Sequence, residues 1–142
     1  MNVDTTGTGW VQRYLDAWNS HDGGQVAAFM AEGVTYEDLA GGTTYRGRDE
    51  VASYVAATHE WSGDYRFVIV TTQSSGRSYA IEWEMLGTNT GELGGIAPTG
   101  KPYRIRGVSV GQLNDAGEIA SNRDYFNFAD YLAQVGLFTY PA

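Results

Sequence analysis

The sequence predicts an α+β fold in which helices cover one face of a long, curved antiparallel sheet. The hydrophobic pattern of the first part of the chain is largely helical, and it later changes to the period of two that is typical of strands. Glycine-containing turns separate several of the later strands. Such a curved sheet forms a cone with an apolar pocket at its mouth. With 142 residues, 42% of them hydrophobic, the chain is expected to form one domain over residues 1–142.

Two helices are predicted at the start of the chain. Aromatic residues that include Tyr14 and Trp18 recur at helical spacing over residues 10–20, which predicts an amphipathic helix. Asp22 is placed to cap a second, short helix that ends near Met30, because an aspartate oxygen accepts hydrogen bonds from the first free backbone N–H groups of a helix.

A short strand and a third helix follow. Residues 34–36 predict the strand, and the pair Gly41-Gly42 marks a turn. Asp49 suits the first turn of the third helix by its negative charge, and this helix is expected to end before Gly63.

The rest of the chain predicts the sheet and a final helix. Strands are expected over residues 65–72, 79–85, 103–113 and 118–126. Residues 87–100 form a glycine-rich loop, and residues 114–117 form a hairpin turn. Asn127 is placed to cap the last helix, and Gly136 lies just past its end.

Composition excludes several classes of function. The chain has no cysteine, so disulfides and thiolate metal sites are excluded, and only His21 and His59 are available as histidine ligands. We therefore expect no metal and no cofactor. The net charge of −8 disfavours nucleic acids and anionic membranes as partners. Residues 1–6 lack a basic patch and an apolar stretch, so we expect no signal peptide and a cytoplasmic protein.

Asp124 is the leading candidate for chemistry. It lies late in the last predicted strand, and strand alternation places Asn122, Asp124 and Phe126 on one face. If this face lines the pocket, burial raises the pKa of Asp124 toward the range of a general acid or base. The alternative is a carboxylate that forms a structural ion pair with a nearby arginine.

Two further carboxylates share one face of a strand. Glu82 and Glu84 alternate with large apolar residues, and this pattern fits either a solvated face or a pocket lined together with Asp124. Arg104 and Arg106 also share a face and are possible partners for either set. Alternation alone does not indicate which face is inside.

A third candidate pair lies on the first predicted strand. Tyr36 and Asp38 share a face, and a phenol with a carboxylate can position a water molecule or a carbonyl oxygen. Alternatively, Tyr36 is a core residue and Asp38 forms the following turn. Tyr14, Trp18 and Tyr54 are expected in the core or in the wall of the pocket.

Several stretches, taken together, resemble the SnoaL-like polyketide cyclase family. They are residues 17–22 (AWNSHD), 45–51 (YRGRDEV), Trp83 with 87–91 (GTNTG), 97–101 (APTGK), 107–110 (GVSV) and 124–126 (DYF). The match covers nearly the whole chain. It implies one SnoaL-like domain with the fold named for nuclear transport factor two, a cone-shaped α+β barrel that usually forms a homodimer through its sheet.

The resemblance also implies an activity. SnoaL-like cyclases close a polyketide ring by intramolecular aldol condensation without a metal or cofactor, and Asp124 occupies the position of their acid/base aspartate. Limonene-epoxide hydrolases of the same superfamily are similar too, with functional positions that fall on Tyr36, Asp38, Glu82, Glu84 and Asp124. In this chain Asp38 replaces an asparagine and Glu82 replaces an arginine of those hydrolases. The resemblance favours an arrangement in which Glu82 and Glu84 face the pocket.

Three hypotheses follow for the function. The first is a cofactor-independent acid/base enzyme that acts on a hydrophobic carbonyl compound as a cyclase, isomerase or lyase, with Tyr36 or Asn89 donating a hydrogen bond to the substrate oxygen. Many members of the cyclase family have histidine at the position of Asn89. The second hypothesis is the opening of an epoxide by water. The third is a module that binds a small molecule or dimerises without catalysis.

Overall fold

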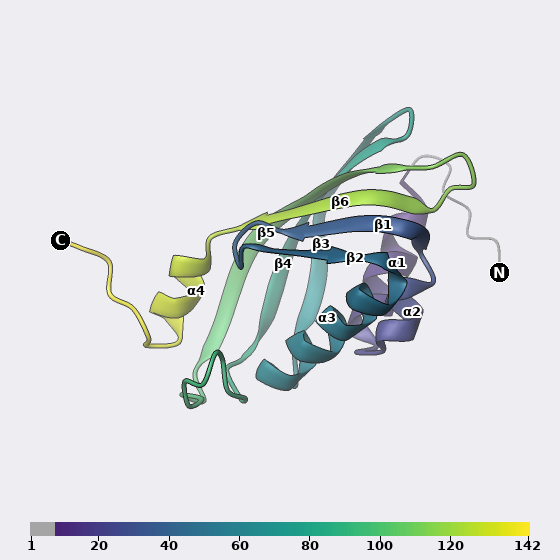
Figure 1. The fold of residues 1–142 in the computed structure, drawn as a ribbon. Helices are drawn as coiled ribbons and strands as arrows, with labels where there is room; N and C mark the ends of the chain where they lie inside the picture. The colour runs from purple at the N-terminus through teal and green to yellow at the C-terminus, as the bar shows by residue number, and fades with distance from the viewer. Residues whose placement is uncertain (1–7) are drawn as a thin grey trace.

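The structure, a computed structural model, describes residues 8–142, and the N-terminal segment considered above for a signal peptide lies outside them. This part of the chain forms four helices and six strands (Figure 1). In chain order they are α1 (Trp10–Asn19), α2 (Gly23–Ala27), β1 (Met30–Asp38), β2 (Thr43–Arg46), α3 (Gly47–Trp61), β3 (Arg66–Ser75), β4 (Ser78–Thr88), β5 (Pro102–Leu113), β6 (Ile119–Phe126) and α4 (Phe128–Gln134).

The strands form one curved sheet in the order β2-β1-β6-β5-β4-β3. Helices α1, α2 and α3 pack along one side of this sheet, and α4 lies toward its other end (Figure 1). The α+β class with helices on one face is as predicted. Two details of the prediction are wrong: the sheet does not close into a barrel, and the β1–β6 pair is parallel. Local alternation reports the faces of a strand, but it carries no signal for a partner about 90 residues away.

The predicted helices are confirmed, with shifted ends. Asp22 caps α2, since its side chain accepts a hydrogen bond of 2.9 Å from the backbone N–H of Gly24. This helix ends at Ala27 instead of near Met30, because Met30 already begins β1. Asn127 caps α4 through the N–H of Asp130 at 3.0 Å.

The predicted strands are confirmed, and one more is present. Strand β2 was not predicted, because its sequence TTYR is too short to show an alternating pattern. It pairs with the second half of β1, whose first half was also not predicted. None of the helices within residues 8–142 has the length and apolarity that a bilayer-spanning helix needs.

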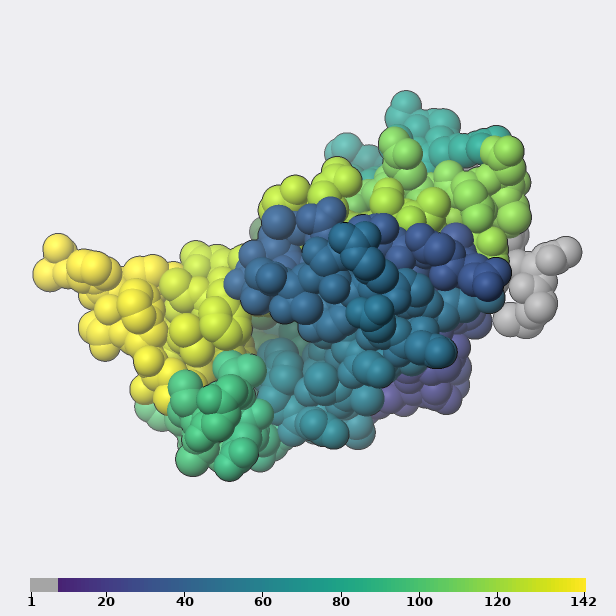
Figure 2. All heavy atoms as spheres, viewed as in Figure 1, coloured from purple at the N-terminus to yellow at the C-terminus, as the bar shows by residue number. Residues whose placement is uncertain are grey.

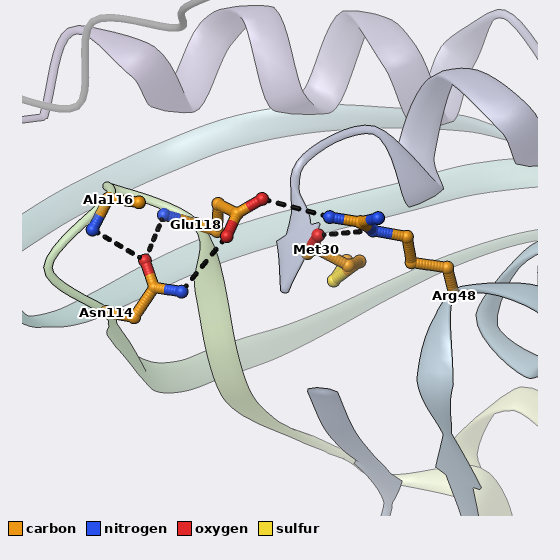
Figure 3. Close-up of polar contacts among 5 residues, drawn as sticks. All are labelled: Met30, Arg48, Asn114, Ala116 and Glu118. Atoms are coloured by element: carbon orange, nitrogen blue, oxygen red, sulfur yellow. Dashed lines mark hydrogen bonds and ion pairs between the residues drawn. The ribbon is translucent and has the colours of Figure 1, made fainter. Parts of the chain in front are cut away.

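A polar cluster ties the start of β1 to the β5–β6 turn (Figure 3). Arg48, in the first turn of α3, donates to the carbonyl of Met30 at 2.9 Å and forms an ion pair with Glu118 at 3.0 Å. The side chain of Asn114 accepts from the N–H groups of Ala116 and Glu118 and so shapes the turn. The cluster therefore joins α3 to the start of β1 and to the turn that leads into β6.

The register of that parallel pair places candidate residues side by side. Tyr36 of β1 lies opposite Asn122 of β6, and Asp38 lies opposite Asp124. All four side chains are buried. The pairing therefore brings the two candidate carboxylates onto neighbouring strands.

The outer, convex face of the sheet carries both charged and apolar side chains. Val68, Val70 and Tyr125 are each at least 40% exposed there. The homodimer that the family resemblance implies would form through this sheet, and it stays a prediction.

Candidate active site

A pocket with an empty volume of about 630 Å³, which includes its open mouth, lies between the sheet and the helices. Ten of its sixteen lining residues are aromatic, and Asp124 is the one charged side chain among the described residues that line it. The lining residues are Tyr14, Leu15, Trp18, Tyr36, Tyr54, Thr58, Trp61, Phe67, Trp83, Met85, Ile105, Ser109, Asp124, Phe126, Phe128 and Tyr131.

Helical and strand periodicity place these side chains. Tyr54, Thr58 and Trp61 recur at i, i+4 and i+7 on α3, so they project from one side of that helix toward the pocket. Phe128 and Tyr131 do the same from α4 at i, i+3. Both helices lie on the face of the molecule that Figure 2 shows. The rings of Trp61 and Tyr131 meet with centroids 5.0 Å apart, so the two helices wall the pocket together.

Three hydrogen bonds hold the carboxylate of Asp124, which is 6% exposed. Ser109, its register partner on β5, donates to Oδ1 at 2.6 Å. The amide of Asn122 donates to the same oxygen at 2.8 Å. The hydroxyl of Tyr36 donates to Oδ2 in a short hydrogen bond. Within the described part of the chain, no arginine forms an ion pair with Asp124, so the structural alternative does not apply.

Two of these donors are held in turn by aromatic residues of β4. The indole Nε1 of Trp83 donates to Ser109 Oγ at 2.9 Å. The hydroxyl of Tyr79 donates to Asn122 Oδ1 at 2.6 Å. The polar network thus extends from the carboxylate through two strands of the sheet.

Burial raises the pKa of Asp124 from 3.8 to about 6. Burial is the largest cause, because desolvation disfavours the ionised form. Hydrogen bonds from Ser109, Tyr36 and Asn122 lower the pKa and so limit the rise. The negative charge of nearby Asp38 adds to it. The carboxyl therefore exchanges its proton near neutral pH, which suits a general acid or base.

The phenols near the carboxylate stay protonated. Burial raises the pKa of Tyr36 and Tyr54 well above 10, and the charge of Asp124 adds to both rises. Burial also raises the pKa of Tyr14. Within the described residues, the hydroxyl of Tyr14 is the one buried side-chain polar group without a hydrogen-bond partner. Tyr14 also lines the pocket, so its hydroxyl is a candidate donor to a ligand.

Most of the predicted site residues lie at the pocket. Asp124, Tyr36, Tyr14, Trp18, Tyr54 and Phe126 line it. Asn122 lies behind the carboxylate, where it contributes one of the donors. Asp38 does not line the pocket: it accepts from the Tyr54 hydroxyl at 3.2 Å and from the N–H of Gly41 at 3.0 Å. Asp38 thus contacts the site through Tyr54.

The expectation that Glu82 and Glu84 face the pocket is wrong. Their neighbours Trp83 and Met85 line it, so the two glutamates lie on the outer face of the sheet. The alternating pattern of β4 is compatible with either face as the inner one. The burial of its large apolar side chains decides which face lines the pocket.

On the outer face the two glutamates lie opposite the arginines of β5. Glu82 lies 3.7 Å from Arg106, and Glu84 lies 3.8 Å from Arg104. Both arginines are more than half exposed, so these ion pairs contribute little to stability.

Asn89 supports the wall of the pocket without lining it. Its amide donates to the Tyr131 hydroxyl at 2.9 Å, and its oxygen accepts from the N–H of Thr99 at 2.6 Å. We expected the Asn89 amide to donate to a substrate oxygen, but it is bound to Tyr131 and does not line the pocket.

Among the described residues, no three His, Asp or Glu side chains converge as metal ligands.

Sequence reasoning missed several functional positions. Ser109 contacts Asp124, and its place on β5 has the same parity as Tyr103 and Ile105, which are buried. Once the inner face of the sheet is known, this alternation identifies Ser109 as a residue that points inward. Trp61 and Phe67 line the pocket without having been singled out, and their only signal was aromatic character.

Comparisons with known proteins agree with this architecture. The family model described as SnoaL-like domain matches residues 11–122. A search of curated proteins found no sequence relative. A candidate polyketide cyclase from Xanthomonas campestris pv. campestris is 28% identical with a TM-score of 0.77, and the match covers 95% of this chain and 99% of that one.

Two other solved structures have lower sequence identity to this chain, so their similarity supports the fold alone. One is a protein with a ketosteroid isomerase-like fold from Catenulispora acidiphila in complex with trimethylamine (24% identity, TM-score 0.80, 89% of this chain and 92% of that one). The other is IdmH, a candidate polyketide cyclase from Streptomyces antibioticus (22% identity, TM-score 0.76, 89% and 95%). The cone fold named for nuclear transport factor two is thereby confirmed.

The raised pKa of Asp124 predicts a pH-dependent cost in stability. Because the native state holds this proton more tightly than the unfolded chain does, the stability that it provides is complete below pH 4 and is lost as the pH rises through about 6. Relative to Asp124→Asn, the free energy of unfolding of the wild type should fall by roughly 3 kcal/mol over this range, since the pKa differs between 3.8 and about 6. Urea unfolding from pH 4 to 7 measures it, and a difference that does not change with pH would contradict the prediction.

Proposed function

The chain belongs to the SnoaL-like domain family, and we propose that it is an acid/base enzyme that forms or rearranges bonds next to a carbonyl group of a hydrophobic small molecule. Intramolecular aldol cyclisation of a polyketide-like substrate is the reaction that we favour. The observation that carries the proposal is a single carboxylate with a pKa of about 6 at an aromatic pocket. A general acid or base works best when its pKa lies near the working pH.

Asp124 serves as base and then as acid in the proposed reaction. The ionised carboxylate removes a proton from the carbon next to a carbonyl and leaves an enolate. The enolate carbon attacks a second carbonyl carbon of the same molecule, which forms the new C–C bond and an alkoxide. Asp124 then returns its proton to the alkoxide oxygen. No atom or electron is lost from the substrate in this sequence.

Tyr14 stabilises the negative charge that develops on the substrate oxygen. Its hydroxyl is buried, has no hydrogen-bond partner in this structure and stays protonated, so it is the donor that we assign to the enolate or alkoxide oxygen. The hydroxyl of Tyr36 is already engaged by Asp124, and the amide of Asn89 by Tyr131. Tyr14 therefore takes the role that the sequence alone assigned to Tyr36 or Asn89.

The aromatic wall supplies orientation and excludes water. Trp18 packs edge to face against both Tyr54 and Phe67, with ring centroids 5.9 and 5.5 Å apart. Trp83 and Phe67 form a further T-shaped pair at 5.2 Å. Rings held in this way offer rigid surfaces to a flat substrate and lower the dielectric around the reacting atoms.

The opening of an epoxide has less support. That reaction would require Tyr36, Asp38 and Asp124 to hold one water molecule. The carboxylate of Asp38 instead binds Tyr54 and Gly41 and does not line the pocket. Glu82, at the position of the arginine in limonene-epoxide hydrolases, lies on the outer face.

Binding of a small organic cation without catalysis is the second candidate. Ring faces attract ammonium groups, and ten aromatic residues line a pocket whose one charged group is a carboxylate. The structural relative from Catenulispora acidiphila was solved with trimethylamine. The same pocket would therefore hold an alkylammonium ion against Asp124.

Replacement of the carboxylate tests the enzyme proposal. We expect the wild type to exchange the protons next to the carbonyl of 2-tetralone, a flat aromatic ketone, in deuterated water faster than buffer alone. The rate should rise with pH through about 6 and then level off, because the ionised form is the base. Asp124→Asn should slow the exchange by about 10²- to 10⁴-fold. Exchange by Asp124→Asn at the wild-type rate, measured by NMR, would exclude the mechanism.

Removal of one hydroxyl tests the role of Tyr14. Tyr14→Phe should lower the exchange rate by about 10²- to 10³-fold, the usual cost of losing one donor to a developing oxyanion. Tyr65→Phe is the matched control, because Tyr65 is buried outside the pocket lining and its hydroxyl donates to the carbonyl of Trp18. Equal rates for the two variants would remove Tyr14 from the mechanism.

Calorimetry distinguishes the binding candidate from the enzyme. Trimethylamine, which is protonated at neutral pH, should bind the wild type more tightly than tert-butanol, a neutral molecule of similar size. Asp124→Asn should reduce the preference, because it removes the negative charge and leaves the aromatic rings. Selective amine binding without any exchange of 2-tetralone would favour the binding module, and equal affinity for the two probes would exclude it.

A further inference from the structure

Three aromatic side chains of the β4–β5 pair each lie across a glycine on the neighbouring strand. They are Tyr79 over Gly111, Trp83 over Gly107 and Tyr103 over Gly87, each pair in direct register. A Cβ atom at Gly111 would lie 2.5 Å from the Tyr79 hydroxyl, and one at Gly107 would lie 2.3 Å from the Trp83 ring. The glycines therefore allow the rings to lie flat against the sheet.

Two of these rings end at the donors that hold Asp124. Across Gly111, the Tyr79 hydroxyl reaches Asn122 on β6, the register partner of that glycine. Across Gly107, the indole of Trp83 reaches Ser109, two residues further along β5. The third ring, Tyr103, instead bonds to Ser62 at 2.7 Å and has no part in the network.

The hydrogen bonds occupy the two carboxylate oxygens unequally. Oδ1 of Asp124 accepts from both Ser109 and Asn122, whereas Oδ2 accepts only from Tyr36. A carboxylate has about four lone-pair sites, so the remaining one lies on Oδ2. A proton on Oδ1 would also leave the buried Ser109 hydroxyl hydrogen without an acceptor, because the indole N–H of Trp83 only donates.

We propose that Tyr79 and Trp83 are positioning residues, which hold the two donors on Oδ1 and so reserve Oδ2 of Asp124 as the oxygen that gains and loses the proton. This inference rests on the acid/base role of Asp124 proposed above. Tyr79 does not line the pocket, so it acts only through Asn122. Trp83 lines the pocket and also acts through Ser109.

The orientation of each donor follows from the same contacts. Burial raises the pKa of Tyr79 well above 10, so it remains a donor at neutral pH. It therefore faces the side-chain oxygen of Asn122, and the amide nitrogen faces Asp124. The reverse orientation of the amide would place its oxygen against the carboxylate.

Few other groups titrate near this carboxyl. The titratable groups that interact with Asp124 are Tyr36 and Asp38 of β1, Tyr14 of α1, Tyr54 of α3 and Tyr79 of β4. Burial keeps the tyrosines neutral, so among the residues that the structure describes Asp38 is the one other charge that acts on the carboxyl.

The variant Tyr79→Phe tests the proposal, because it removes one oxygen atom and leaves the ring over Gly111. The carboxyl of Asp124 is followed by ¹³C NMR, with its signal assigned by its loss in Asp124→Asn. We expect its pKa to rise by up to about 1 from its value of about 6, because the ionised form loses part of a hydrogen bond worth more than one pKa unit. Below the pKa, the C=O stretch of the neutral acid should move to higher frequency, because Oδ1 loses a donor.

The variant Tyr103→Phe is the matched control. It removes the same atom from a buried ring over Gly87, at a hydrogen bond with Ser62 that does not reach Asp124. Both variants are expected to lose some stability, but only Tyr79→Phe should move the titration of Asp124. Trp83→Phe provides a second test, with a shift in the same direction through Ser109.

The outcomes separate this inference from the proposed function. If Tyr79→Phe and Trp83→Phe leave the titration and the C=O stretch as in Tyr103→Phe, the positioning role is overturned, whatever the activity. If both measures move as expected while the wild type exchanges no ketone protons, the positioning role stands and the enzyme proposal fails. If Tyr79→Phe does not fold, the titration in Trp83→Phe decides in the same way.

Discussion

Burial of the Asp124 carboxylate makes its ionised form costly, and much of the surrounding structure offsets that cost. Desolvation of a carboxylate costs several kcal/mol even after relaxation, so an ionised group at this depth requires donors. The structure supplies three of them, from Tyr36, Ser109 and Asn122, and none of the described residues adds a cation as an ion-pair partner. A neutralising arginine would have lowered the pKa of the carboxyl, whereas neutral donors leave it at about 6.

The topology of the sheet explains why these donors meet. Ser109 and Asn122 come from the two adjacent antiparallel strands β5 and β6, whereas Tyr36 comes from β1, which joins the sheet in parallel. Without the β1–β6 pair, Oδ2 would have no partner. The contacts of Arg48 with Met30 and Glu118 stabilise the start of that pair, although they lie outside the pocket lining.

Prediction from the sequence succeeded where the signal was local. Caps at Asp22 and Asn127 and the aromatic stripe of α1 depend on residues within two helical turns, and the structure contains all of them. It failed for Glu82 and Glu84, because alternation fixes two faces of a strand but not which face is inside. It also did not single out Ser109, whose importance arises from its cross-strand position opposite Asp124.

The two candidate functions make opposite demands on the same carboxyl. An ammonium ion favours ionised Asp124 and would lower its pKa, whereas a neutral ketone that displaces water desolvates the carboxylate further and would raise its pKa. Proton abstraction further requires a hydrogen-bond donor that stabilises the negative charge on the substrate oxygen. Binding of a cation requires no such donor. The unpartnered hydroxyl of Tyr14, buried in a pocket wall where an unused donor costs free energy, therefore weighs toward the enzyme.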